Sequence, residues 1–172
     1  MSDALSDTLS DVMPDDRTAL IDLLARWDRW LDESRFTADE TAVLFTPDAE
    51  AVTPGGVSRG IDALTAQAAR GRSIWAATQH LHTNPVVEID GDRAAIGINR
   101  LIFLVAHDPA GTPETVPAPT LTLGERCRVE AARTADGWRI TRLGGTLLWA
   151  SDPEALARAT ARGRAATAAQ AG

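Results

Sequence analysis

Apolar residues recur at helical spacing near the N-terminus and at alternate positions through most of the second half of the chain. The helical part predicts one amphipathic helix from Asp15 to Glu33, with Asp15 or Asp16 as its N-cap. Its apolar stripe consists of Leu20, Leu23, Leu24, Trp27 and Leu31. We expect this face to pack against the rest of the molecule.

Three shorter elements are predicted after this helix. Residues 37–40 have the spacing of a capping box and predict a short second helix that ends near Pro47. The Pro-Gly-Gly breaker at residues 54–56 limits residues 49–53 to a short strand. A third helix is predicted over residues 60–72.

After residue 73 the period of the pattern changes to two. Long strands are predicted over residues 77–90, 93–107, 121–133 and 138–149, joined by tight turns or a Pro- and Gly-rich loop. Helices followed by an antiparallel meander indicate an α+β fold, with three N-terminal helices packed on one face of a curved antiparallel sheet.

The two ends of the chain differ in composition from this domain, which we expect over residues 15–152. Residues 1–14 are acidic and repeat a Ser-Asp phrase, so they predict a disordered tail or a weak helical turn. Residues 153–172 are rich in Ala and Arg and predict a C-terminal helix or tail.

Residue types that are missing narrow the possible chemistry. All 17 basic residues are Arg, no Tyr is present, and Cys127 is the single cysteine. These absences exclude a Schiff-base or P-loop lysine, a phenolic general acid, a disulfide and a cysteine zinc cluster. Carboxylates, three histidines and Arg remain for catalysis, and we expect neither a cofactor nor a metal.

The charge balance narrows the possible partners. The net charge is −7, and five Asp lie within residues 1–16, so the rest of the chain carries 19 acids (24 − 5) against 17 Arg. A nearly neutral domain without a basic patch argues against nucleic acid as a partner. No apolar run approaches a membrane span and no signal sequence opens the chain, so we expect no membrane partner and a cytoplasmic protein.

Six short phrases along residues 15–152 carry a family resemblance. They are Asp16-Arg17 to Asp32, Val43-Leu44-Phe45-Thr46-Pro47-Asp48-Ala49, Ser58-Arg59-Gly60-Ile61, Thr78-Gln79-His80 with Asn84, Val87 to Ala94, and Asp136-Gly137-Trp138-Arg139-Ile140. In this order they resemble the SnoaL-like branch of the nuclear-transport-factor-2-like superfamily, which includes scytalone dehydratase, ketosteroid isomerase and limonene epoxide hydrolase. The resemblance implies a cone formed by a curved sheet, a cystatin-like α+β barrel. It does not specify the reaction, because this fold hosts many chemistries.

Three polar residues alternate along the first long strand. His80, His82 and Asn84 are two positions apart, so we expect their side chains on one face of the sheet. The resemblance to scytalone dehydratase implies that His80 points into the cone, where we expect it to be catalytic. Because His82 and Asn84 share its face, we expect them to be substrate contacts. The alternatives are a structural His80 satisfied by a neighbour and a solvated His82 at the rim.

Two acids of the first helix are candidates for the catalytic partner. The helical wheel places Asp28 at the edge of the apolar stripe, whereas the resemblance implies that Asp32 is the inward acid. Either could instead form a surface salt bridge. An acid beside His80 would fix its tautomer and raise its pKa.

The sequence departs from the dehydratase pattern at several positions. Leu31 stands where that enzyme has a tyrosine, and the absence of Tyr also removes the phenol of the isomerase. The second dehydratase histidine aligns near Val105, so we expect His107 to approach the mouth of the cavity.

Further substrate contacts are predicted from strand alternation and aromatic content. Arg126 and Arg128 share one phase and could face inward, to bind an anion or an acid, or outward. Inward arginines beside an acid would resemble the acid-Arg-acid relay of the epoxide hydrolase. The aromatic residues expected to line the cavity are Trp27, Phe45, Trp75, Phe103 and Trp149.

Together these features predict a cofactor-independent lyase or isomerase with dehydratase- or cyclase-like chemistry on an apolar small molecule, such as a polyketide or aromatic compound. A non-catalytic binding or assembly module is the alternative, and epoxide hydrolase-like water activation is a lesser one. We also expect a homodimer through the outer sheet face, as the resemblance implies, with Arg100, Ile102 and Leu104 pointing outward.

Overall fold

Six strands form one curved sheet in the order β2-β1-β6-β5-β4-β3. The computed structural model describes residues 15–53, 56–107 and 117–170, with side chains described as far as residue 162. The elements are α1 (Asp16–Asp32), α2 (Ala38–Ala42), β1 (Phe45–Thr53), β2 (Gly56–Arg59), α3 (Ile61–Ser73), β3 (Trp75–Asp90), β4 (Arg93–Ala106), β5 (Leu121–Thr134), β6 (Gly137–Ala150) and α4 (Pro153–Gln170).

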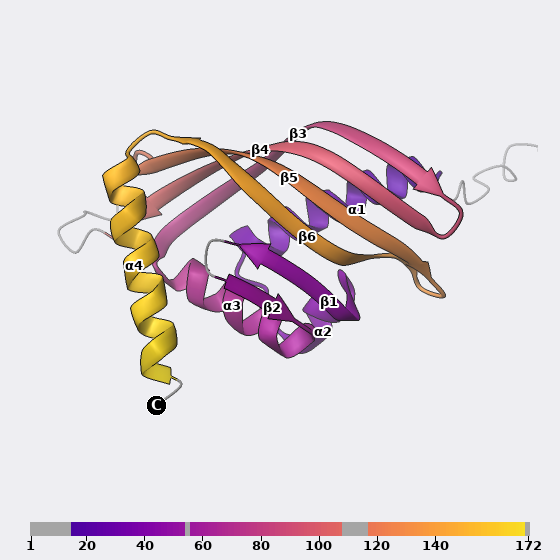
Figure 1. The fold of residues 1–172 in the computed structure, drawn as a ribbon, viewed down its shortest axis with the longest axis horizontal. Coiled ribbons are helices and arrows are strands. Elements are labelled where there is room, and N and C mark those ends of the chain that lie inside the picture. The colour runs from indigo at the N-terminus through magenta and orange to yellow at the C-terminus, as the bar shows by residue number, and fades with distance from the viewer. Residues whose placement is uncertain (1–14, 54–55, 108–116, 171–172) are drawn as a thin grey trace, which may run out of the picture.

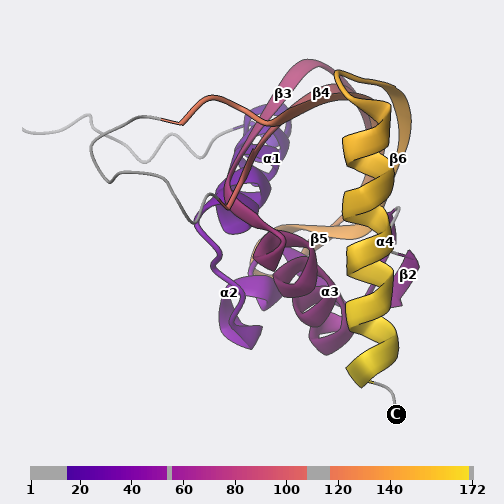
Figure 2. The same cartoon turned by 90° about the vertical axis from the view of Figure 1, so that its left-hand side faces the viewer.

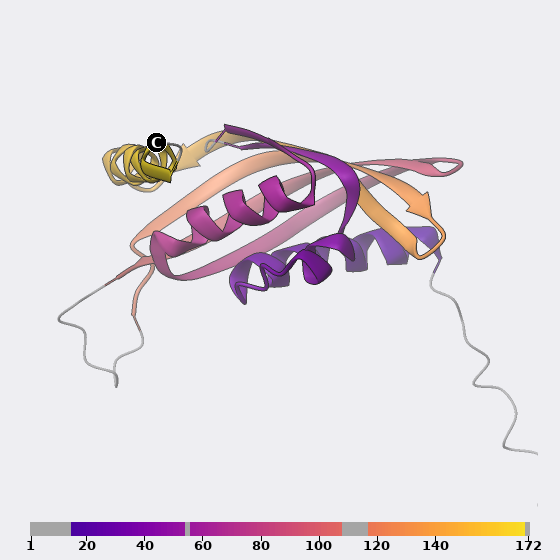
Figure 3. The ribbon, with the colours of Figure 1, turned by 90° about the horizontal axis from the view of Figure 1, so that it is seen from below.

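The sheet is antiparallel except between β1 and β6, which run parallel. It bends over α1 and α3, which lie along its concave face (Figures 1 and 3). The core forms between this face and the helices, where Leu20 and Leu23 of α1 and Ile96, Val129 and Ile140 of the sheet are fully buried. The curved α+β fold predicted from the pattern is therefore the observed one.

The predicted caps determine where the first two helices begin. The Asp15 carboxylate accepts a hydrogen bond from the Thr18 backbone N–H at 2.7 Å. The Thr37 hydroxyl accepts one from the Glu40 N–H at 3.2 Å and donates to the Glu40 carboxylate at 3.0 Å, so Thr37 is the N-cap of α2. Helix α2 ends at Ala42, earlier than predicted, because β1 already begins at Phe45.

The first hairpin also differs from the prediction. Strand β1 is longer than residues 49–53, because Phe45 is buried in the core and pairs with Ile140 of β6. The pairing with β6 is irregular between Phe45 and Glu50, around Pro47, which has no N–H to donate. The unpredicted strand β2 pairs with β1, and Arg59 meets Glu50 at 2.5 Å across the pair.

The alternation of β4 corrects the expected orientation of its side chains. Arg100, Ile102 and Leu104 are buried on the concave face, whereas they were expected to point outward. Strand alternation explains this, because Ile96 and Ile98 lie in the same phase and pack into the core. Phe103, in the opposite phase, therefore faces the outer side of the sheet.

Helix α4 lies at one end of the molecule, beside α3 (Figure 2). Asp152 caps it by accepting a hydrogen bond from the Ala155 N–H at 2.9 Å. Leu156 packs on an apolar cluster formed by Ile102, Leu104, Leu121 and Leu123. The acidic tail predicted over residues 1–14 lies outside the described residues. Among the described helices, none is long and apolar enough to cross a membrane.

Candidate active site

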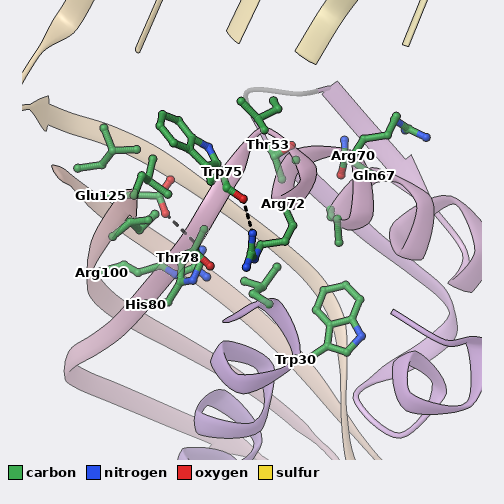
Figure 4. Close-up of a pocket in the computed structure, with 18 of the residues that line it drawn as sticks. Trp30, Thr53, Gln67, Arg70, Arg72, Trp75, Thr78, His80, Arg100 and Glu125 are labelled. Atoms are coloured by element: carbon green, nitrogen blue, oxygen red, sulfur yellow. Dashed lines mark hydrogen bonds and ion pairs between the residues drawn. The ribbon is translucent and has the colours of Figure 1, made fainter. Parts of the chain in front are cut away.

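A cavity of about 330 Å³ lies between the concave sheet face and the helices (Figure 4). Such a volume is within the range of small-molecule sites, about 300–1,000 Å³. Its walls are mainly apolar and include Trp27, Trp30, Leu31, Phe45, Ile74, Trp75, Ile102, Leu104, Leu123 and Leu143. Helix α4 closes one side with Leu156, Ala159 and Thr160.

Asp32 and His80 meet at the wall of this cavity. Asp32 Oδ1 lies 2.5 Å from His80 Nδ1, and Asp32 Oδ2 accepts the His80 backbone N–H at 2.9 Å. The Thr78 hydroxyl donates to Oδ1 at 2.8 Å. The carboxylate is thus held by three donors, and the side chain of His80, which is 11% exposed, lines the cavity.

The spacing of α1 and β3 explains why a second pair follows the first. Four helical residues rise about 6.0 Å and two strand residues about 6.6 Å. Asp28 and Asp32 on α1 therefore match His82 and His80 on β3, with the two elements running in opposite directions. Asp28 Oδ2 lies 2.8 Å from His82 Nδ1. Both predicted acids face β3, each beside its own histidine.

Burial decides the protonation state of the first pair. Desolvation, reinforced by the positive charge of Arg100, lowers the pKa of His80 below its ordinary value, although Asp32 opposes this. The sequence predicted a raised pKa, so this expectation is wrong. Burial acts to raise the pKa of Asp32, but hydrogen bonds from His80 and Thr78 more than offset it and leave that pKa lowered.

At neutral pH the pair is therefore an ionised Asp32 and a neutral His80. Because the carboxylate accepts from Nδ1, that nitrogen carries the proton. The unprotonated Nε2 remains as the basic atom of a side chain that lines the cavity. This arrangement suits a general base.

The second pair belongs to a buried row of charges. Arg100 lies opposite His82 on β4, and Glu125 lies opposite Arg100 on β5. Arg100 is 3.5 Å from both Asp28 Oδ1 and Glu125 Oε2, and its guanidinium stacks 4.3 Å above the Trp27 ring. Figure 4 shows the ion pair between Arg100 and Glu125 at the cavity wall.

The contacts within this row are electrostatic rather than well-aligned hydrogen bonds. Neither ring nitrogen of His82 has a hydrogen-bond partner despite the short distance from Nδ1 to Asp28, because the geometry is poor. Nε and Nη2 of Arg100 likewise lack one. His82 lies behind the cavity wall, between Asp28 and the Trp27 ring, 5.1 Å from the ring centroid.

Three other predicted contacts lie outside the cavity. Asn84 is exposed with φ of 53°, because β3 has an irregularity between Thr83 and Val86 that ends the alternation begun at His80. Phe103 faces outward, for the reason given above. His107 is exposed, and its Nε2 lies 3.3 Å from the Ser73 carbonyl.

The remaining predicted contacts, Arg126, Arg128 and Trp149, are exposed. Glu125 and Cys127 occupy the inward phase of β5, which leaves both arginines on the outer face. Trp149 pairs with Gly124 and covers it, since a Cβ there would lie 2.2 Å from the indole. Of the predicted aromatic lining, Trp27, Phe45 and Trp75 line the cavity, whereas Phe103 and Trp149 do not.

The main polar residue that sequence reasoning missed is Arg100. A signal for it exists, because Ala94, Ile96, Ile98, Ile102 and Leu104 make every other position of that phase apolar. A charge in an apolar strand phase indicates a buried functional or structural group. Glu125 carries a weaker signal, in the same phase as Leu123 and Cys127.

Among the described residues, no group of three His, Cys, Asp or Glu side chains is arranged to hold a metal ion. Burial raises the pKa of the Cys127 thiol to about 11, so this cysteine is a poor nucleophile. The reactive groups of the cavity are thus His80 with Asp32, and the Arg100 row.

A family model for the SnoaL-like domain matches residues 14–144, most of the chain. The chain belongs to the SnoaL-like domain family. Its sheet and helices have the nuclear-transport-factor-2-like fold seen in structures of this superfamily. The SnoaL-like match ends within β6, so α4 and its contribution to the cavity lie beyond it.

Several solved structures share this fold. The Kfla4162 protein from Kribbella flavida is 26% identical, with a TM-score of 0.70 over 83% of this chain and 97% of that one. A hexachlorocyclohexane dehydrochlorinase, LinA-type3 from Novosphingobium barchaimii LL02, is 18% identical, with a TM-score of 0.62 over 78% and 88%. A candidate scytalone dehydratase from Novosphingobium aromaticivorans DSM 12444 is 18% identical, with a TM-score of 0.64 over 79% and 86%. No curated protein matches the chain significantly.

Proposed function

We propose that this SnoaL-like protein is a cofactor-independent lyase or isomerase in which His80 is the general base. The observation that carries the proposal is the pairing of Asp32 with His80 at 2.5 Å in the wall of an apolar cavity. A neutral histidine that is oriented by an ionised carboxylate is suited to remove a proton from carbon beside a carbonyl group.

The chemistry would proceed by proton transfer. His80 Nε2 takes the proton, and the electron pair of the broken C–H bond forms an enolate or a carbon–carbon double bond. In a lyase the leaving group departs from the next carbon and takes the proton back from the imidazolium. In an isomerase the proton returns to a different carbon. Asp32 stabilises the transient imidazolium in either case.

The names of two similar structures support elimination as the reaction class. Dehydrochlorination and dehydration both remove a proton and a leaving group from neighbouring carbons. Both structures are below 25% identity, so the likeness itself shows the fold, and the Asp32–His80 pair carries the proposed activity. The apolar walls favour an apolar or aromatic substrate, such as a polyketide.

Proton exchange tests the proposal without knowledge of the substrate. Aromatic ketones such as 2-tetralone would be incubated with the protein in D₂O, and loss of the C–H signal next to the carbonyl would be followed by NMR. We expect the wild-type protein to exchange this proton faster than buffer alone. His80→Gln should abolish the faster exchange, whereas His107→Gln, a control at an exposed position, should retain it. Equal exchange in the wild type and in His80→Gln would contradict a catalytic His80 and favour a binding module.

Water activation is a second candidate, supported by one observation. Arg100 lies between Asp28 and Glu125, each at 3.5 Å, and both Arg100 and Glu125 line the cavity. This order of acid, arginine and acid resembles the relay of the epoxide hydrolase. Its arginine is Arg100 rather than the predicted Arg126 or Arg128. Hydrolysis of styrene oxide in H₂¹⁸O that depends on Glu125 and not on His80 would support this candidate over the lyase.

A further inference from the structure

Arg72 is a cation in the cavity wall that is bound only to neutral groups. It lies in the last turn of α3, and its Nη1 and Nη2 donate to the carbonyls of Trp75 at 2.5 Å and Ala76 at 3.2 Å. Its Nε is buried without a hydrogen-bond partner. Among the described residues, no carboxylate forms an ion pair with it.

The cavity wall contains another arginine, Arg100, which is buried and whose charge is already balanced. Arg100 has Asp28 and Glu125 on either side at 3.5 Å. A ligand anion near Arg100 would meet these two carboxylates, whereas one near Arg72 would not. Arg70, on the same helix as Arg72, also lines the cavity, and its side chain extends away from Arg72 in Figure 4.

The guanidinium of Arg72 is held in place and still has N–H donors without an acceptor. Arginine has five N–H donors, and the two carbonyls accept from only two of them. A cation beside apolar walls without a counterion is unfavourable, so an anion that enters the cavity gains more there than it would at an exposed arginine. A carboxylate matches the planar fork of arginine and can accept from two of its N–H groups at once.

We propose that Arg72 binds the carboxylate of an anionic substrate, an aromatic or otherwise apolar carboxylic acid. The apolar body of this ligand would lie against walls such as Trp30, Ile74 and Trp75, in the same cavity as His80. The inference deepens the proposed function, since it assigns the substrate class to the His80 site, but the binding itself requires no turnover.

The experiment compares two probes of the same shape, 2-naphthoate and 2-naphthamide. Their dissociation constants would be measured at pH 7.5 by quenching of the cavity tryptophans and by calorimetry. We expect the wild type to bind the carboxylate about tenfold or more tightly than the amide, as a charge-assisted contact would require. Arg72→Gln should bring the ratio near one and leave amide binding unchanged, which also shows that the cavity is intact.

Two further variants make the result specific. Arg72→Lys keeps the charge and should retain a preference for the carboxylate. Arg93→Gln removes an exposed arginine of β4 and matches the change in net charge, so it should leave the ratio unchanged. A wild type without preference, or one that binds neither probe, would overturn the proposal.

Arg72 could instead serve only to tie α3 to the start of β3. In that case Arg72→Gln would melt at a lower temperature yet keep the preference for the carboxylate, which would also overturn the proposal. The proposed catalysis fails separately. If the protein prefers naphthoate through Arg72 but shows no His80-dependent proton exchange, the anion site is supported and the lyase or isomerase activity is contradicted.

Discussion

At the scale of single residues, the contacts of Asp32 define the chemistry of the site. The carboxylate accepts from the Thr78 hydroxyl and from both the ring and the backbone N–H of His80. Because every donor is supplied by two residues of β3, the acid cannot rotate away from His80 without losing several hydrogen bonds. The geometry therefore fixes the tautomer of His80 before any ligand binds.

Removing either member of this pair should cost activity rather than fold. We expect His80→Gln and Asp32→Asn each to lower kcat/KM by roughly 10²-fold to 10⁴-fold. The double variant should lose less than the sum of the two effects in free energy, because the residues act as one unit. Asp22→Asn, an exposed site on the same helix, is the matched control. Additive losses would show that the two residues act independently.

The lowered pKa of His80 predicts an acid limb in the pH profile. The basic form is active, so kcat/KM should be flat near neutral pH and fall as the pH drops through a pKa below the ordinary value of 6.5. A kcat/KM that stays high between pH 5 and pH 8 while His80 is protonated would contradict a role as general base. The profile would be measured with a substrate whose own protonation does not change in this range.

The same shift has a consequence for stability. The unfolded chain binds a proton at His80 more readily than the folded one, so the free energy of unfolding should decrease as the pH falls below 6.5. His80→Gln removes this contribution and should show a shallower decrease between pH 7 and pH 5. Urea unfolding of both proteins at the two pH values measures the difference. Parallel decreases would mean that burial does not lower the pKa of His80.

At the scale of elements, two adjacent strands and one helix hold a row of three charged residues inside an apolar core. Arg100 of β4 contacts Asp28 of α1 and Glu125 of β5, and only 8% of its side chain is exposed. Burying each of these charges costs desolvation free energy, which only the attraction of its oppositely charged neighbour offsets. The row therefore couples the position of α1 to that of the sheet.

Arg100→Met should accordingly destabilise the protein. The substitution leaves two buried carboxylates without a cation, and we expect a loss of about 3–5 kcal/mol in the free energy of unfolding. Arg128→Met, on the outer face of β5, should change it by less than about 0.5 kcal/mol. Adding Glu125→Gln to Arg100→Met should recover part of the loss. Denaturant titrations of the three variants would measure these values, and equal stability of Arg100→Met and Arg128→Met would contradict the coupling.

At the scale of the whole molecule, a row of paired, mainly apolar residues crosses four strands on the outer face of the sheet. Leu81, Leu101, Gly124 and Trp149 are successive partners from β3 to β6. Leu81 is 41% and Trp149 is 47% exposed. We propose that this row, rather than the buried Arg100, Ile102 and Leu104, forms the interface of a homodimer.

Light scattering tests the dimer directly. At micromolar concentration we expect a particle of twice the 18.3 kDa chain mass. Trp149→Glu should shift it to the monomer by placing a charge in the apolar row. Val57→Glu, at a 66% exposed position on β2 away from the row, should remain dimeric. A wild-type protein that stays monomeric would refute the interface.

The sequence by itself determined most of the elements and their order along the chain, although not strand β2. Helical and alternating periodicities depend on short-range geometry, and caps such as Asp15 act within one turn, so both are visible in the chain. The family resemblance carried by Thr78-Gln79-His80 and by the first-helix phrase that ends at Asp32 pointed to the two residues that the structure brings together.

The tertiary structure alone decided which side chains reach the cavity and in what state. The phase of β4 placed Arg100 inward, the irregularity in β3 turned Asn84 out, and the pairing of Gly124 placed Trp149 on the outer face. Burial lowered the pKa of His80, although a neighbouring acid alone predicts the opposite. Each of these outcomes depends on contacts between residues far apart in sequence, on register and on desolvation, which local patterns do not contain.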